Sequence, residues 1–143
     1  MGDLGEQAYH FIDFLVAAGQ SVWQILPLSP TGLGDSPYQS PSAFAGNPNL
    51  ISLEKLLEWG WLKREVLRRH RQLHSSDVPY TDVWQWKREC LWEMATDPEF
   101  VITWKPYEQF CASQSYWLQD YALYSAIKEF FHGSMGSYIW PRR

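Results

Sequence analysis

Residues 21–48 read SVWQILPLSPTGLGDSPYQSPSAFAGNP, a short apolar run followed by a long loop rich in proline and glycine. The apolar run, residues 21–26, predicts a buried strand, because it contains β-branched and aromatic side chains and Pro27 would end it. A connection of about twenty residues without helix or strand signals, such as residues 27–48, is uncommon in a compact domain. Connections of this kind usually serve as binding loops, lids or linkers.

The composition of this loop favours a binding site over a linker. Its five prolines stiffen the backbone, and its three glycines permit turns and close approach of the backbone. A linker would not need this stiffness together with side chains that can bind a hydroxyl-rich ligand. Those polar and aromatic side chains are Asp35, Ser36, Tyr38, Gln39 and Asn47.

The segment before the predicted strand is expected to be a helix. Asp3, followed three positions later by Glu6, has the pattern of a capping box, and apolar residues recur from Ala8 at helical spacing. Gly19 is expected to end the helix, in the position just after the C-cap. The order helix, turn, strand and long loop is typical of an α/β protein in which parallel strands alternate with helices.

Most of the remaining chain predicts helix. Residues 50–53 are a second, weaker strand candidate. Five helices follow, at 54–62 (ending near Gly60), 63–73, 82–95 (starting at Asp82 or Thr81), 106–112 and 115–131. The last helix carries apolar residues nearly all the way round, so it is expected to be buried on most sides. Few strands are available to cover it. We therefore expect the chain to be a piece of a longer protein.

Charge and composition restrict the class of protein. A net charge of −4 argues against a nucleic-acid binder that neutralises phosphates. No apolar run reaches the roughly 18 residues of a membrane helix, and the first residues lack the features of a signal peptide. Cys90 and Cys111 are too few and too far apart for a disulfide framework. The prediction is a cytoplasmic protein without a nucleic-acid or membrane partner, and its oligomeric state stays open.

Common catalytic and cofactor motifs are incomplete. Gly32-Leu-Gly34 begins like a dinucleotide fingerprint but lacks its third glycine. His70 and His74 have a zinc-compatible spacing, but Arg71 stands where the zinc-peptidase pattern needs Glu. The sequence contains no Gly-x-Ser-x-Gly elbow and no convincing pair of carboxylates for glycoside chemistry. We predict no cofactor and no metal, and carboxylates for any glycosyl transfer would have to come from elsewhere.

Aromatic residues are the compositional outlier, at 17% with nine Trp, and they allow two interpretations. Bulky core packing is one of them. The other is stacking on sugars, because a pyranose ring presents C–H groups that lie flat on an indole or phenol. For any single Trp, core packing is favoured.

Residues 20–49 closely resemble the amylomaltases, the 4-alpha-glucanotransferases or disproportionating enzymes of glycoside hydrolase family 77. The resemblance rests chiefly on the run Asp35-Ser-Pro-Tyr-Gln-Ser40 and on Ser42-Ala-Phe-Ala-Gly-Asn-Pro48. It extends over nearly the whole chain through shorter matches. These are Gly2-Asp-Leu-Gly5, Val78-Pro-Tyr80 with Lys87, Trp117-Leu-Gln-Asp-Tyr-Ala-Leu123 and Trp140-Pro141.

The resemblance implies a partial (β/α)8 TIM barrel of the α/β class with an inserted, mainly helical subdomain. A bare barrel already needs about 250 residues, so this chain would be an N-terminal fragment of one larger catalytic domain. Residues 1–53 would hold the early βα units with the substrate-binding loop 27–48. Residues 54–143 would form the mainly helical insertion.

The activity implied by the resemblance is transfer of a segment of a 1,4-alpha-D-glucan to the 4-hydroxyl of an acceptor glucose or glucan. The reaction would retain configuration through a covalent glycosyl-enzyme. The family's catalytic carboxylates lie on later barrel strands, so no catalytic residue is assigned and the fragment alone is expected to be inactive. The partners would be malto-oligosaccharides and alpha-1,4-glucans, without a preference for maltose, glycogen or starch.

The resemblance assigns substrate contacts only in the loop. Tyr38 would line the donor subsite next to the scissile bond, and Ser36 is similar to a neighbouring substrate contact. Asp35 and Gln39 match the motif, either as substrate contacts or as residues that hold the shape of the loop. Asn47 is expected to be a turn residue.

A different class of protein also fits the aromatic composition: a free-standing, non-catalytic carbohydrate-binding or interaction module. Such a module would unfold cooperatively and bind malto-oligosaccharides unaided. A fragment of a barrel would instead expose strand edges and aggregate.

Overall fold

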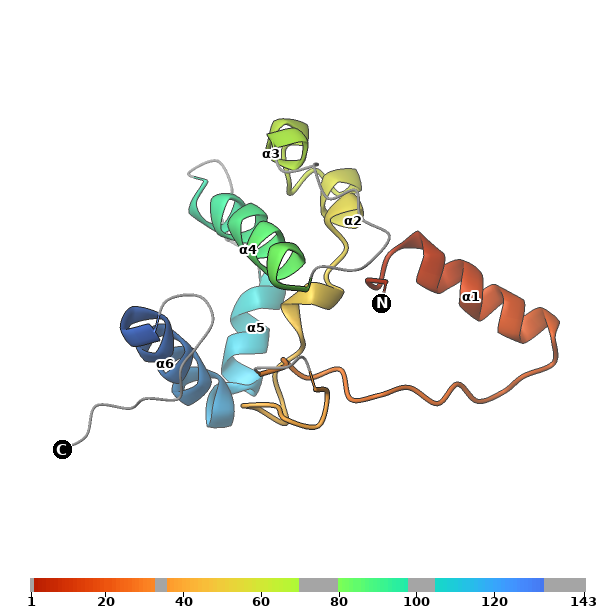
Figure 1. Ribbon diagram of the computed structural model, residues 1–143, viewed down its shortest axis with the longest axis horizontal. Helices are drawn as coiled ribbons and strands as arrows, with labels where there is room; N and C mark the ends of the chain where they lie inside the picture. The colour runs from red at the N-terminus through yellow and green to blue at the C-terminus, as the bar shows by residue number, and fades with distance from the viewer. Residues whose placement is uncertain (1, 33–35, 70–79, 98–104, 133–143) are drawn as a thin grey trace. The chain divides into compact units, whose positions relative to one another are not determined.

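The computed structural model describes residues 2–32, 36–69, 80–97 and 105–132, and the regular secondary structure of these residues is helical (Figure 1). The chain divides into two compact units: Met1–Leu28 with Gly46–Phe100, and Ser29–Ala45 with Val101–Arg143. The helices are α1 (Glu6–Ala17), the 3-10 helix η1 (Pro48–Leu50), α2 (Leu53–Glu58), α3 (Arg64–Arg69), α4 (Tyr80–Thr96), α5 (Lys105–Ser113) and α6 (Ser115–His132). None of the described helices is both long and apolar enough to cross a membrane.

Helix α1 ends as predicted but begins later. Gly5 is the N-cap and has no side-chain cap bond, so the predicted capping box does not form. Asp3 instead accepts the Gly5 N–H through Oδ1 at 3.1 Å. At the other end Gly19 has a φ of 70°, and the Gln20 N–H donates to the Leu15 carbonyl at 2.9 Å. This is the Schellman arrangement that a glycine after the C-cap permits, and the prediction for Gly19 is confirmed.

The predicted buried strand at residues 21–26 does not form within the described structure. Residues 20–28 run extended after α1 without a neighbouring strand, as Figure 1 shows. Val22 is 81% exposed and Trp23 is 44% exposed. An extended segment becomes a strand only when a second segment accepts and donates its ladder hydrogen bonds, and no described residue does so. A (β/α)8 barrel is therefore not seen in the described residues.

The second strand candidate, residues 50–53, is wrong, because capping side chains turn this segment into two helix starts. The Asn47 side chain accepts the Asn49 N–H at 3.0 Å and begins η1, with Pro48 as its first residue. The Ser52 hydroxyl accepts the Lys55 N–H at 3.3 Å and begins α2. These caps satisfy N–H groups that have no partner within the helix.

The predicted helices at residues 54–62, 82–95, 106–112 and 115–131 are confirmed to within a few residues by α2, α4, α5 and α6. Gly60 has a φ of 75° and follows the C-cap of α2, as its predicted role requires. Of the predicted helix 63–73, residues 64–69 are α3, and residues 70–73 lie outside the described residues, as do His70 and His74.

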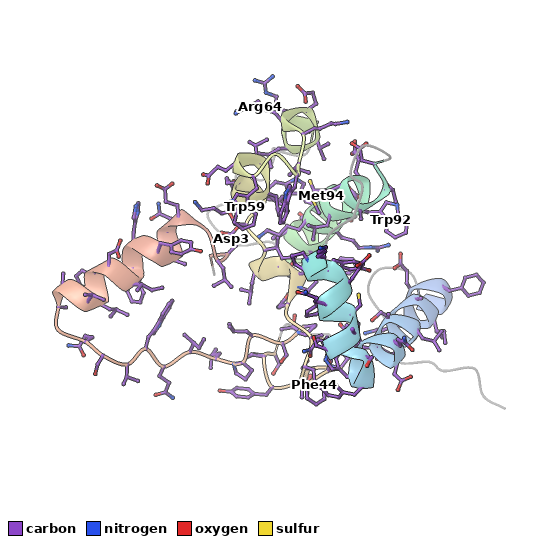
Figure 2. All side chains as sticks on the ribbon, turned by 180° about the vertical axis from the view of Figure 1, so that it is seen from behind. Asp3, Phe44, Trp59, Arg64, Trp92 and Met94 are labelled. Carbon is purple, nitrogen blue, oxygen red and sulfur yellow. The ribbon has the colours of Figure 1, made fainter. Side chains whose placement is uncertain are left out.

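The core of the first unit lies between α2, α3 and α4. Its buried apolar side chains come from all three helices and from the turn after α2, and partly buried neighbours pack on them. Figure 2 shows Met94 on the core side of α4, whereas Trp92, two residues earlier, points away and is 68% exposed. The buried members are Leu53, Leu56, Leu62, Val66 and Cys90.

Helix α6 is not buried on most sides, contrary to the prediction. None of residues 115–130 is buried, and Tyr116, Leu123 and Phe130 are 66%, 61% and 83% exposed. The second unit offers too little described structure to cover a helix that is apolar all round. Burial of a helix with apolar residues on all sides needs more partners than these residues supply.

Candidate functional site

The two ends of the loop at residues 27–48 are tied together. The Asn47 N–H donates to the Leu28 carbonyl at 2.8 Å. Within the loop, the Gly32 N–H donates to the Gln39 carbonyl and the Gln39 N–H donates to the Ser36 carbonyl, both at 3.1 Å. The loop is therefore folded back on itself by its own backbone.

Serine hydroxyls fix the second half of the loop. Ser40 Oγ donates to the Ser42 carbonyl at 2.7 Å and accepts the Ser42 N–H at 3.2 Å. Ser42 Oγ in turn accepts the N–H groups of Phe44 and Ala45, at 3.2 and 3.1 Å. A loop with its backbone groups already paired loses less conformational entropy when it binds a ligand.

Three of the four predicted site residues, Ser36, Tyr38 and Gln39, share one tight turn. Tyr38 lies at its tip and is 76% exposed, so its ring and hydroxyl are open to a ligand. Ser36 is half-buried, and Gln39 is exposed next to it. Asp35 lies outside the described residues. Asn47 caps η1, which confirms its predicted role as a turn residue.

An aromatic cluster in the second unit joins the loop to α6, and sequence analysis did not identify it. The Phe44 ring lies 5.5 Å from that of Tyr116, edge to face, and 5.9 Å from that of Trp117, stacked. Trp117 continues to Tyr121 at 6.0 Å and donates its indole N–H to Gln114 Oε1 at 2.7 Å. Figure 2 shows Phe44 beside the first turn of α6. Phe44 and Trp117 each occur in a matched motif, but nothing in the sequence indicates that the two rings are in contact.

The first unit contains a buried lysine that contacts the residues just after the loop. Lys87 on α4 is 5% exposed, and its ammonium donates to Asp3 Oδ2 at 3.0 Å. It also donates to the carbonyls of Asn49 and Ile51, each at 2.7 Å. All three of its N–H donors are used. The only sequence signal for Lys87 was its place in a matched motif.

The described residues offer no metal centre. No group of three or more His, Cys, Asp or Glu side chains within residues 2–32, 36–69, 80–97 and 105–132 is placed to hold a metal ion. What these residues provide is a braced loop with an exposed phenol, a hydroxyl and an amide. Such a set suits the stacking and hydrogen bonding of a polyhydroxylated ligand rather than bond making.

Comparison with known proteins assigns the chain to a class of carbohydrate-active enzymes. The sequence profile of the family described as 4-alpha-glucanotransferase, glycoside hydrolase family 77, matches residues 1–143. The chain belongs to this family, which confirms the resemblance seen in the sequence.

Similarity to individual 4-alpha-glucanotransferases supports the same family assignment. The chain is 44% identical to the 4-alpha-glucanotransferase of Synechocystis over 99% of its own length and 28% of the relative's. It is 46% identical to that of Aquifex aeolicus over 90% of the chain and 26% of the relative. With the Thermus thermophilus protein it shares 41% identity over 99% of the chain and 28% of the relative. The chain thus spans little more than a quarter of the length of these relatives.

Proposed function

We propose that this chain is part of a 4-alpha-glucanotransferase and supplies one wall of its glucan-binding cleft. The observation that carries the proposal is the braced loop with the exposed Tyr38, in a chain that matches the family along its whole length. The substrates are malto-oligosaccharides and other alpha-1,4-glucans.

The reaction proceeds in two steps with two carboxyl groups, as in retaining enzymes of this chemistry. A carboxylate attacks C1 of the donor sugar, the C1–O4 bond breaks, and a carboxylic acid gives its proton to the departing O4. The 4-hydroxyl of an acceptor then attacks C1, releases the carboxylate and returns its proton to the second group. Both carboxyl groups belong to parts of the protein beyond this chain.

The residues of this chain bind and orient the donor. The Tyr38 ring stacks on a glucose face beside the scissile bond, and its hydroxyl together with that of Ser36 bonds sugar hydroxyls. Asp35 and Gln39 either reach the sugar or hold the turn. Because the loop is braced before the ligand arrives, more of the binding energy remains for orienting the sugar.

We also propose that the extended residues 21–26 are a strand of a (β/α)8 barrel, with residues 1–53 as its early βα units and residues 54–143 as a mainly helical insertion. The extended backbone of this segment supports the proposal, because its N–H and C=O groups need a neighbouring strand. Its exposed apolar side chains support it as well, because they need a surface that covers them. In such barrels the loops that follow the strands form the active face, and residues 27–48 are one of these loops.

The test uses the full-length protein that contains this chain, with maltotriose as its only substrate. Transfer converts maltotriose into shorter and longer chains without changing the number of reducing ends, whereas hydrolysis increases that number. The isolated chain is expected to show neither reaction. Glucan binding by the isolated chain, without any transfer by the full-length protein, would favour the non-catalytic module instead.

The site is tested in the same assay. We expect Tyr38→Ala to lower kcat/KM roughly 100-fold, about 2.7 kcal/mol of transition-state binding. Its thermal stability should not change, because the ring is exposed. Tyr38→Phe keeps the stacking surface and should lose less. Tyr107→Ala removes an equally large exposed side chain from α5 and serves as the control. Unchanged kinetics in Tyr38→Ala would remove Tyr38 from the site.

A further inference from the structure

We propose that Lys87 is a positioning residue for the substrate loop: its buried ammonium fixes the segment from which residues 27–48 emerge. The inference rests on the proposed function for its catalytic consequence. Its structural part, that Lys87 sets the order of the loop, stands on the geometry alone.

The contacts of the Lys87 ammonium are complete. Lys87 lies on the core face of α4, three residues before the fully buried Cys90 and seven before Met94. A lysine ammonium is rarely buried unless its charge is paired. Here Asp3 supplies the opposite charge, and two backbone carbonyls take the other two protons.

The carbonyls that Lys87 binds lie directly after the loop. The carbonyls of Asn49 and Ile51 accept from Lys87, and the Leu50 carbonyl between them accepts the Leu4 N–H at 2.8 Å. Three successive carbonyls directly after the loop are therefore fixed, two of them by one side chain. Two residues upstream, the Asn47 N–H is bonded to the Leu28 carbonyl, so the constraint reaches both ends of the loop.

Lys87 is also linked to the N-terminal segment through Asp3. Asp3 accepts the Lys87 proton with Oδ2 and the Gly5 N–H with Oδ1. One carboxylate thus holds the start of α1 and pairs the lysine charge. Lys87 joins three segments that are far apart in the sequence: residues 3–5, residues 49–51 and α4. Its loss would free the base of the loop without touching Tyr38.

The structural part is tested by amide hydrogen exchange in the full-length protein with Lys87→Met. Exchange at the loop amides of Gly32, Gln39 and Asn47 is expected to speed up at least tenfold, while amides in α6 keep their rate. Lys55→Met is the matched control, because Lys55 pairs on the surface with Glu58 in the same unit. Uniform acceleration along the chain, or none, would overturn the proposal.

The catalytic part is tested by a double-mutant cycle on kcat/KM, measured per folded enzyme. We expect Lys87→Met to lower kcat/KM 10- to 100-fold and to raise KM. Mere loss of folded protein would lower the maximal rate and leave KM unchanged. If Lys87 acts through the loop, its effect should largely disappear in the Tyr38→Ala background. Effects that simply multiply would overturn the inference.

A milder variant covers the case in which Lys87→Met does not fold. Asp3→Asn keeps an acceptor for Gly5 and the two carbonyl bonds of Lys87, but removes the paired charge. It should show the same selective loop exchange and the same dependence on Tyr38, and wild-type behaviour of Asp3→Asn would contradict the proposal. Wild-type protein without transferase activity would contradict only the proposed function, because the exchange experiment does not depend on it.

Discussion

At Gly5 the structure leaves no room for a side chain. A Cβ there would lie 2.7 Å from Asp3 Oδ1 and 2.8 Å from Ser52 Oγ. Both oxygens already accept backbone N–H groups, so neither can move without losing a bond. We expect Gly5→Ala to destabilise the protein by about 1–3 kcal/mol in urea unfolding. Gly46→Ala is the control, since nothing lies within 4 Å of its added Cβ, and equal stabilities of the two variants would contradict the account.

Residues with local roles could be predicted from the sequence, and a residue with distant partners could not. Gly19, Gly60 and Asn47 were predicted correctly, because their roles depend on local backbone geometry that a few neighbouring residues specify. The role of Lys87 could not be predicted, because its partners are 36 to 84 positions away in the sequence. A basic residue in a helix predicts an exposed side chain unless the opposing segments are known.

Among the elements, α2 is six residues long and depends on its two ends. Helices this short gain little from propagation, so their caps contribute much of their stability. Gly60 at φ 75° allows the Trp61 N–H to reach the Leu56 carbonyl at 2.8 Å. Gly60→Ala should cost about 1 kcal/mol in chemical unfolding, and Gly60→Asn should cost less, because Asn tolerates this conformation better. Equal costs for Ala and Asn would mean that the backbone conformation is not the cause.

In α6, partial burial raises the pKa of Tyr121 above its ordinary value, although a hydrogen bond with Ser125 opposes the shift. The folded state therefore keeps the phenol proton to higher pH than the unfolded state does. The stability contributed by Tyr121 is complete below pH 10 and should be lost as pH rises through the folded pKa. Thermal melts from pH 9 upward should show a steeper loss in wild type than in Tyr121→Phe, and parallel losses would contradict the prediction.

Most helices were predicted correctly, whereas neither predicted strand is present in the described residues, and the difference has a physical reason. A helix satisfies its backbone groups within one segment, so glycines and capping residues mark its ends in the sequence. Residues 21–26 have the composition of a strand, but a strand exists only with a partner, and the described residues provide none. Residues 50–53 failed differently, because Pro48 and Ser52 supply helix starts that outweigh a short apolar run.

For the whole molecule, exposed apolar surface is the feature that most needs an explanation. Nearly all of α1 and residues 20–28 are exposed, including Phe14 at 63% and Val22 at 81%. Large exposed apolar surfaces usually mark an interface. The chain spans little more than a quarter of its relatives' length, which leaves room for the larger protein proposed above to cover this surface.

This explanation predicts opposite outcomes for one substitution in two contexts. In the isolated chain, Val22→Asp replaces an exposed side chain and should leave the melting temperature unchanged while improving solubility. If residues 21–26 form the proposed barrel strand in the full-length protein, the same change buries a charge there and should destabilise by several kcal/mol, or prevent folding. Gln20→Asp, an exposed position just before the segment, should be neutral in both. If Val22→Asp is neutral in the full-length protein, residues 21–26 do not become a buried strand there.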